Sequence, residues 1–193
     1  MSKTYTDLVE LLYKLDKRIE REYPNEHITY RMDVIGGFAL LYHGFRVSVP
    51  LTRDIDLINE MSARLWRISQ EVDNTNWLND HANEILFSMD KDIKNALKFT
   101  KDEKYRFPYN HIDLYIAPID TLIATKLYSL VNQAGQGITL DSLTRCNDRL
   151  DLIEIFRLYN ICNEIDFKLH YPDLSDYIDK EKDVFNMFKL WGK

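Results

Sequence analysis

Two aspartates, Asp54 and Asp56, alternate with apolar residues in a short run of the sequence. Such alternation predicts a half-buried strand, on which side chains two residues apart project from the same face. Two carboxylates placed in this way repel each other unless a cation lies between them. Mg²⁺ prefers oxygen ligands and binds to one or two carboxylates together with waters and phosphates, so the pair predicts a magnesium site. Acidic alternation on an exposed strand is the competing interpretation.

A glycine pair, Gly36-Gly37, precedes the aspartates, between a predicted strand over 28–35 and a helix-favouring run that ends at Gly44. Without side chains, glycines let the backbone approach a phosphate, and the free N–H groups and dipole of a following helix favour an anion. The segment therefore predicts a cradle for a triphosphate. A tight turn that needs positive φ is the alternative.

Asp113 is the candidate for a third carboxylate. It lies in a predicted strand over 109–117, where apolar neighbours on alternate positions anchor the strand in the core. Two metal ions can hold the attacking and leaving oxygens of an in-line displacement when a third carboxylate completes their ligand set. We therefore expect Asp54, Asp56 and Asp113 to be the catalytic and metal-binding residues of a phosphoryl-transfer site.

Two blocks of sequence carry a more specific pattern. The first is Gly36-Gly37-Phe38-Ala39-Leu40, His43-Gly44 and Thr52-Arg53-Asp54-Ile55-Asp56-Leu57, and the second is Pro118-Ile119-Asp120-Thr121-Leu122-Ile123-Ala124-Thr125-Lys126-Leu127 followed by Arg145, Asp148 and Asp151-Leu152. In this order, they resemble the motifs of the polymerase-β-type nucleotidyltransferase superfamily. The resemblance is closest to its small bacterial branch, which includes abortive-infection and toxin–antitoxin nucleotidyltransferases.

The resemblance implies an α+β fold, in which a mixed β-sheet is flanked by helices and followed by a helical C-terminal part. We expect a nucleotidyltransferase core with an N-terminal helix over residues 1–118, and a helical region over 119–193 packed on that core. The implied reaction moves a nucleoside monophosphate from a nucleoside triphosphate (NTP) to an acceptor hydroxyl, with two Mg²⁺ ions as cofactors. Acceptors in the family are tRNA ends, protein hydroxyls and small molecules such as antibiotics, and the sequence does not choose among them.

Lys126 interrupts the apolar stripe of a predicted helix over 120–133, so it lies on the inward side of that helix. The resemblance implies that Gly36, Gly37 and Lys126 hold the phosphates of the nucleotide. A lysine that extends from the rim of the core into water is the alternative.

Asp148 and Asp151 begin the inward face of another predicted helix, over 141–163. The resemblance implies that Asp148 contributes to nucleotide binding. A structural ion pair and a direct catalytic role are equally compatible with the position of these acids.

Two features depart from the family pattern. Many members of the wider superfamily have Ser or Thr directly after the glycines, where a hydroxyl meets phosphate, whereas this chain has Phe38. A longer loop also moves Arg46 away from the Thr-x-Asp segment. These departures favour the alternative function, a catalytically inactive nucleotidyltransferase-like module that binds a partner, for instance as a toxin–antitoxin component.

The composition is that of a globular protein, with 45% apolar residues, 29% charged residues and a formal net charge of −6. This balance lacks the basic footprint of most nucleic-acid-binding proteins. A local basic cluster is interleaved with acids, which is typical of a solvated helix face. Its members are Lys91, Lys94, Lys98, Lys101, Lys104 and Arg106.

The sequence also excludes several other classes of protein. No apolar run reaches the roughly 18 residues of a membrane-spanning helix. The two cysteines, Cys146 and Cys162, fall in one helical pattern and cannot pair there, so we expect a cytoplasmic protein. The histidines lack zinc-binding spacing, and no Walker, dinucleotide-binding or Gly-x-Ser-x-Gly motif is present.

Overall fold

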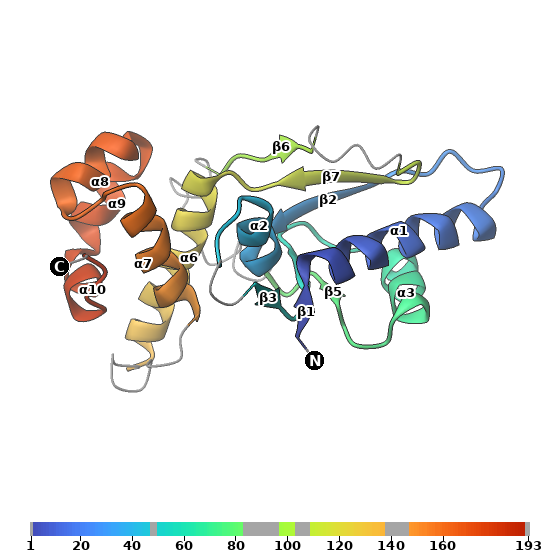
Figure 1. Ribbon diagram of the computed structural model, residues 1–193, viewed down its shortest axis with the longest axis horizontal. Coiled ribbons are helices and arrows are strands. Elements are labelled where there is room, and N and C mark those ends of the chain that lie inside the picture. The colour runs from blue at the N-terminus through green and yellow to red at the C-terminus, as the bar shows by residue number, and fades with distance from the viewer. Residues whose placement is uncertain (1, 47–49, 83–96, 103–108, 138–146, 192–193) are drawn as a thin grey trace. The chain divides into compact units, whose positions relative to one another are not determined.

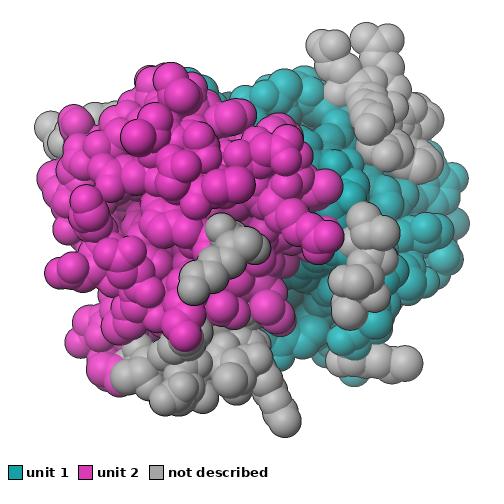
Figure 2. Space-filling view, turned by 60° about the vertical axis from the view of Figure 1, so that its left-hand side comes forward, with its two compact units in different colours: residues 1–88, 98–118 teal, residues 89–97, 119–193 magenta. Residues whose placement is uncertain are grey.

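The computed structural model describes residues 2–46, 50–82, 97–102, 109–137 and 147–191 (Figure 1). Within these ranges it contains eight α-helices, a short 3₁₀ helix and a mixed five-stranded sheet, in agreement with the predicted α+β class. The chain divides into two compact units, coloured separately in Figure 2. Unit 1 comprises residues 1–88 and 98–118, and unit 2 comprises residues 89–97 and 119–193.

The sheet of unit 1 has the strand order β5-β4-β2-β7-β6. Its strands are β2 (Tyr30–Ile35), β4 (Ile55–Leu57), β5 (Leu78–Asn79), β6 (Thr100–Lys101) and β7 (Ile112–Ile116). The central strand β2 runs parallel to β7 and antiparallel to β4, while β5 is parallel to β4 and β6 is antiparallel to β7. A separate pair of strands, β1 (Lys3–Thr4) and β3 (Leu51–Thr52), is antiparallel.

The five-stranded sheet has one apolar face and one polar face, because its residues alternate in character. The buried residues of the apolar face include Met32, Val34, Leu57, Ile112, Leu114 and Ile116. On the other face, Arg31 is paired with Asp113 and Asp33 with Tyr115 across β2 and β7. These four side chains are at least partly exposed. Alternation along the chain therefore predicted correctly which residues share a face.

In its described residues, unit 1 also has three helices, namely α1 (Tyr5–Glu22), α2 (Gly36–Tyr42) and α3 (Ala63–Val72). A capping box starts α1, since the Thr4 hydroxyl accepts the Asp7 N–H at 3.1 Å and the Asp7 carboxylate accepts the Thr4 N–H at 2.8 Å. Helices α1 and α3 lie side by side (Figure 1), and a 2.7 Å ion pair joins Arg18 to Glu71. The side chains of α1 that enter the core are Leu8, Leu11, Leu12, Leu15 and Ile19.

Unit 2 is helical in its described residues. It contains α6 (Ile119–Gly135), α7 (Asn147–Leu158), α8 (Glu164–His170), η1 (Pro172–Leu174), α9 (Ser175–Lys180) and α10 (Lys182–Met187). Four aromatic rings form its centre, where Trp191 stacks on Phe185 at 5.0 Å and on Phe156 at 5.8 Å, and Phe167 packs edge-on against Phe156 at 5.5 Å. Offset and edge-on arrangements of this kind are the favoured geometries of aromatic pairs.

Two long helices predicted for this region are shorter in the structure. The helix predicted over 141–163 ends at Leu158, because Asn160 has a φ of 54° and Asn163 caps the next helix by accepting N–H groups of that helix. The amphipathic spacing over 174–190 also predicts one helix, but the structure divides this segment into η1, α9 and α10, with Glu181 in a non-helical conformation between the last two. The amphipathic spacing of the sequence continues through these breaks, so it did not indicate where the helices end.

Several predicted features lie outside the described ranges, among them Arg145, Cys146, Lys91, Lys94, Lys104 and Arg106. Among the described helices, none is long and apolar enough to cross a membrane.

Candidate functional site

Asp54 and Asp56 meet at one side chain, the amide of Asn79. The Asn79 Nδ2 group donates to Asp54 Oδ2 at 3.1 Å and to Asp56 Oδ1 at 3.3 Å. The register explains this contact, because Asn79 on β5 is the parallel partner of Asp56 on β4. Both aspartates therefore point to the same place on the polar face of the sheet.

Burial raises the pKa of Asp54 above the ordinary value of an aspartate. The charge of Arg53, the hydrogen bond from Asn79 and the charges of His81 and Arg46 act in the opposite direction. The carboxylate thus lies in a partly desolvated place with several positive or donor groups around it. A cation between the carboxylates would relieve the cost of their ionisation.

The pair Gly36-Gly37, called the glycine turn below, lies against Asp56. Gly36 has a φ of 69°, and any Cβ on this residue would collide with the Asp56 carboxylate. A Cβ on Gly37 would collide with the Thr52 hydroxyl and would lie 2.7 Å from Nη1 of Arg46. Glycine is therefore required at both positions by close approach, and at Gly36 by positive φ as well.

Thr52 and Arg46 accordingly lie against Gly37, the second glycine of the pair. Thr52 is 8% exposed, and Nη1 of Arg46 donates to the Leu51 carbonyl at 3.2 Å. Arg46 has a φ of 61°, a conformation that is uncommon outside glycine and asparagine. Although several residues separate Arg46 from the Thr-x-Asp segment in the sequence, its guanidinium lies against Gly37.

Phe38, the residue after the glycines, belongs to the core. Its side chain is fully buried, and its ring stacks on Tyr5 with 5.0 Å between centroids. A hydroxyl on the side chain at this position would be buried in the core. Among the described residues, Thr52 instead places a hydroxyl against the glycine pair.

Asp113 lies away from the aspartate pair. Asp56 is opposite Ile35 on β2, whereas Asp113 is opposite Arg31, four residues earlier on the same strand. Four residues span about 13 Å along a strand, and two metal ions of one site are only about 4 Å apart. Asp113 is ion-paired with Lys101 at 2.5 Å. The register therefore does not support the prediction that Asp113 completes the carboxylate set.

The histidines near the polar face have structural partners. The His43 ring bonds the Ala117 carbonyl at 2.8 Å through Nε2, and the His111 ring bonds the Ile28 carbonyl at 2.9 Å through Nδ1. Since a carbonyl can only accept, each of these nitrogens carries a hydrogen. Within the described ranges, no three histidine, cysteine or acidic side chains converge into a metal-binding group.

In unit 2, Lys126 is the centre of a buried ionic cluster. Its Nζ lies 2.8 Å from Asp148 Oδ1 and 2.7 Å from Asp151 Oδ2, and the Ser129 hydroxyl donates to Asp148 Oδ2 at 2.7 Å. Burial by itself would lower the pKa of Lys126, but the charges of Asp148 and Asp151 outweigh it and the pKa lies above the ordinary value. The lysine is thus charged, buried and engaged by two carboxylates.

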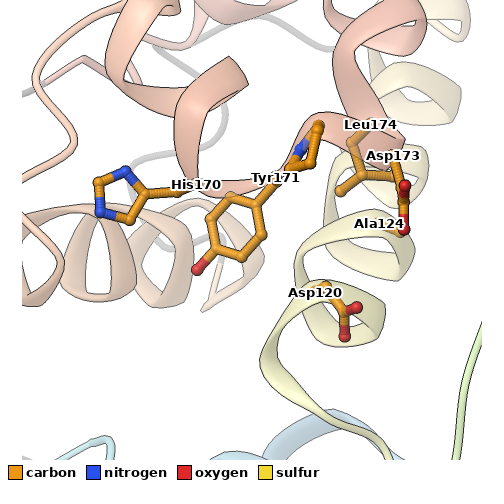
Figure 3. Close-up of a pocket in the computed structure, with 7 residues that line it drawn as sticks. Asp120, Ala124, His170, Tyr171, Asp173 and Leu174 are labelled. Atoms are coloured by element: carbon orange, nitrogen blue, oxygen red, sulfur yellow. The ribbon is translucent and has the colours of Figure 1, made fainter.

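A cavity of about 100 Å³ in unit 2 lies between α6 and the segment from His170 to Leu174 (Figure 3). The Asp120 carboxylate accepts the Thr121 N–H at 2.8 Å, and the His170 ring bonds the Asp166 carbonyl at 2.8 Å. Figure 3 shows the side chains of His170 and Asp120 pointing in different directions. They do not form an acid–base pair.

The sequence thus indicated Asp54, Asp56 and the glycines, and the structure brings these residues together. Asn79, Thr52 and Arg46 were not assigned to the site beforehand. Thr52 has a signal in the sequence, its place two residues before Asp54. Asn79 has none, because the polar composition of residues 74–80 predicts a turn. Comparisons of the chain with protein-family models, curated proteins and solved structures give no match.

Proposed function

We propose that the protein is a magnesium-dependent nucleotidyltransferase, which moves a nucleoside monophosphate from an NTP to an acceptor hydroxyl and releases pyrophosphate. The observation that carries this proposal is the contact of the glycine turn with Asp56, in a site where Asn79 ties Asp56 to Asp54. A side-chain-free turn beside two carboxylates suits a triphosphate and the cation that accompanies it. The five-stranded sheet with its helices would be the nucleotidyltransferase core.

The donor groups at the aspartate pair fit a magnesium ion. Both are carboxylates, and the partly buried Asp54 has a raised pKa that a cation would lower. Mg²⁺ binds to one or two carboxylates and retains positions for water and phosphate oxygens. When bound, it would neutralise the negative charge that develops on the transferred phosphoryl group.

The phosphate end of the site would consist of Gly36, Gly37, Thr52 and Arg46. The glycines leave room for phosphate oxygens, the Thr52 hydroxyl can donate to one of them, and the Arg46 guanidinium supplies positive charge. The Thr52 hydroxyl thus offers the donor that Phe38 lacks. Positioning and charge neutralisation are the main means of catalysis in phosphoryl transfer, and these groups supply both.

The phosphate role that the resemblance implies for Lys126 has less support than that of Arg46. The Lys126 ammonium is already paired with two carboxylates within unit 2. Breaking those pairs would leave buried charges without partners, which is expensive. Arg46 lies directly on the glycine turn.

A second candidate function is a nucleotide-binding module without turnover. The position of Asp113 favours it, because the described residues contain only two carboxylates at the glycine turn. Such a module would bind Mg–NTP but transfer nothing. Its binding could serve a protein partner, as in a toxin–antitoxin pair.

Transfer of label from α-labelled NTPs tests the proposal. The purified protein is incubated with each NTP and with pools of tRNA, protein or antibiotics, and the release of pyrophosphate is followed in parallel. We expect the wild type to label one pool and the Asp54→Asn and Asp56→Asn variants to label none. Label transfer that persists in both variants would refute the assignment. Calorimetric binding of Mg–NTP without turnover on any acceptor would favour the second candidate.

A further inference from the structure

We infer that Asn79 is a positioning residue of the metal site, which holds Asp54 and Asp56 together so that the pair is ready for a divalent cation. The inference rests on the proposed metal site at these aspartates. It assigns the third side chain of that site to β5, whereas the sequence placed it on β7.

Asn79 occupies a rigid position. Its strand β5 is anchored by Trp77 and Leu78, which are 0% and 1% exposed. The Trp77 carbonyl accepts the Ile55 N–H at 2.7 Å, and the Trp77 ring nitrogen donates to the Ser69 carbonyl at 3.1 Å. The segment that precedes Asn79 is thus tied to β4 through its backbone and to α3 through the Trp77 ring. The Asn79 side chain is itself almost fully buried, in a residue that is 8% exposed.

The orientation of the amide is determined by its surroundings. The Oδ1 atom faces the N–H of His81 at 3.3 Å. Because a backbone N–H can only donate, the atom opposite it must be the oxygen. The amide therefore turns its NH₂ group toward the carboxylates, at 3.1 Å from Asp54 and 3.3 Å from Asp56. The two hydrogens of the Asn79 NH₂ group thus bond one carboxylate each.

This arrangement offsets the repulsion between the acids. Two carboxylates side by side oppose each other's ionisation, and a donor that bonds the charged forms favours it. Each carboxylate oxygen has two lone pairs, so a hydrogen bond from Asn79 leaves capacity for a metal ion.

Groups that orient metal ligands by hydrogen bonds affect the metal strongly, and their replacement commonly weakens binding by about 10- to 100-fold. A purely structural asparagine would act differently. Its loss would lower the stability of β5 but would leave the affinity of the remaining ligands unchanged. Metal affinity and its pH dependence therefore separate the two roles.

The experiment measures Mn²⁺ binding to the full chain in the absence of nucleotide, by calorimetry or by electron paramagnetic resonance, between pH 5 and 8. Asn79→Leu has a similar size but lacks the donor, and Asn79→Ser is a smaller variant that retains one donor and secures the test if Asn79→Leu does not fold. The matched control is Asn59→Leu. Asn59 also bonds through both ends of its amide, but to the backbone of Asp33 and Arg31.

We expect Asn79→Leu to raise the Kd for Mn²⁺ by about 10- to 100-fold, Asn79→Ser to have a smaller effect, and Asn59→Leu to have none. The pH at which half of the Mn²⁺ binding is lost should move upward in Asn79→Leu. A wild-type Kd and pH midpoint in both Asn79 variants would overturn the inference while leaving the metal site intact. Absence of Mn²⁺ binding to the wild type would instead overturn the proposed metal site, and the role of Asn79 with it.

Discussion

The Nζ atom of Lys126 lies 2.7 Å from Oδ2 of Asp151, and each side chain is only 6% exposed. Charges that are removed from water in this way depend on each other, because neither can recover its hydration if the other is lost. The pair joins α6 to α7, two helices of unit 2. The ion pair therefore contributes to the stability of unit 2, independently of any role of Lys126 in nucleotide binding.

Replacement of Lys126 by Met should lower the free energy of unfolding by about 3–5 kcal/mol, the usual loss when one partner of a buried ion pair is removed. Urea denaturation monitored by circular dichroism measures this quantity. Lys168→Met is the matched control, since Lys168 pairs with Glu164 and Asp179 at a more exposed position and should contribute little. Equal stability of the two variants would show that the Lys126 cluster is not the structural element described above.

Gly36→Ala should remove metal binding. Alanine at this position combines an unfavourable positive φ with a collision against the Asp56 carboxylate. Gly44→Ala is the control, because Gly44 has a φ of 84° but open space around the added methyl group. Both variants should lose about 1–2 kcal/mol of stability from the backbone conformation alone. Mn²⁺ titration should separate them, with binding retained in Gly44→Ala and absent in Gly36→Ala.

Asp54→Asn should make the metal-free protein more stable at pH 7. The folded-state pKa of Asp54 is raised, mainly by burial, so ionisation of this group opposes folding. Its contribution is most favourable below the unfolded pKa of about 3.9 and is lost as the pH rises through the higher folded-state pKa.

Urea titrations in EDTA at pH 4 and pH 7 measure this effect. The gain from Asp54→Asn should be present at pH 7 and smaller at pH 4, because the raised pKa leaves less of the wild-type carboxyl ionised at the lower pH. Lower stability of the variant at pH 7 would mean that Arg53 and Asn79 contribute more than burial costs.

Asp113→Asn should leave nucleotidyl transfer close to the wild-type rate. Asp113 is opposite Arg31 and Asp56 is opposite Ile35, and these two residues of β2 are about 13 Å apart along the strand. The partner of Asp113, Lys101, is at an exposed position. Rates of pyrophosphate release, compared with those of Asp56→Asn, provide the test. Loss of activity equal to that of Asp56→Asn would restore Asp113 to the catalytic set.

Arg46→Gln should weaken the binding of an NTP by about 10- to 100-fold, the effect of losing a charge-assisted hydrogen bond worth about 1.5–3 kcal/mol. The corresponding nucleoside, which has no phosphates, should bind to both proteins equally. Arg53→Gln is the control, because Arg53 is an exposed arginine that neighbours Asp54 in sequence. Calorimetry of the wild type and the two variants with both ligands measures six affinities, and equal weakening of NTP binding by the two substitutions would argue against a specific role for Arg46.

Patterns of short range predicted much of the fold. The spacing of Leu8, Leu11 and Leu15 indicated α1, the alternation around Asp113 indicated β7, and the glycine pair was correctly expected between a strand and a helix. Each of these signals lies within a few residues of the chain. The two-residue strands were missed, because so short a run has no period to detect.

The assembly of the site was harder to predict, because it depends on register. Nothing in the sequence states that β7 pairs with β2 so that Asp113 is opposite Arg31, or that β5 pairs with β4 so that Asn79 is opposite Asp56. A shift of a few residues along a neighbouring strand decides which side chains meet. The approach of the glycines to an aspartate was therefore within reach of the sequence, but which side chain lies opposite Asp56 was not.

Strand β1 pairs Lys3 with Thr52 and Thr4 with Leu51, so the start of the described chain is hydrogen-bonded to the segment that carries the Thr52 hydroxyl. This pairing has a practical consequence for anyone who purifies the protein. An affinity tag attached before Lys3 would leave the fold beside Thr52, where a polyhistidine sequence could compete for the metal or obstruct the nucleotide. Activity measurements are better made with a cleavable tag.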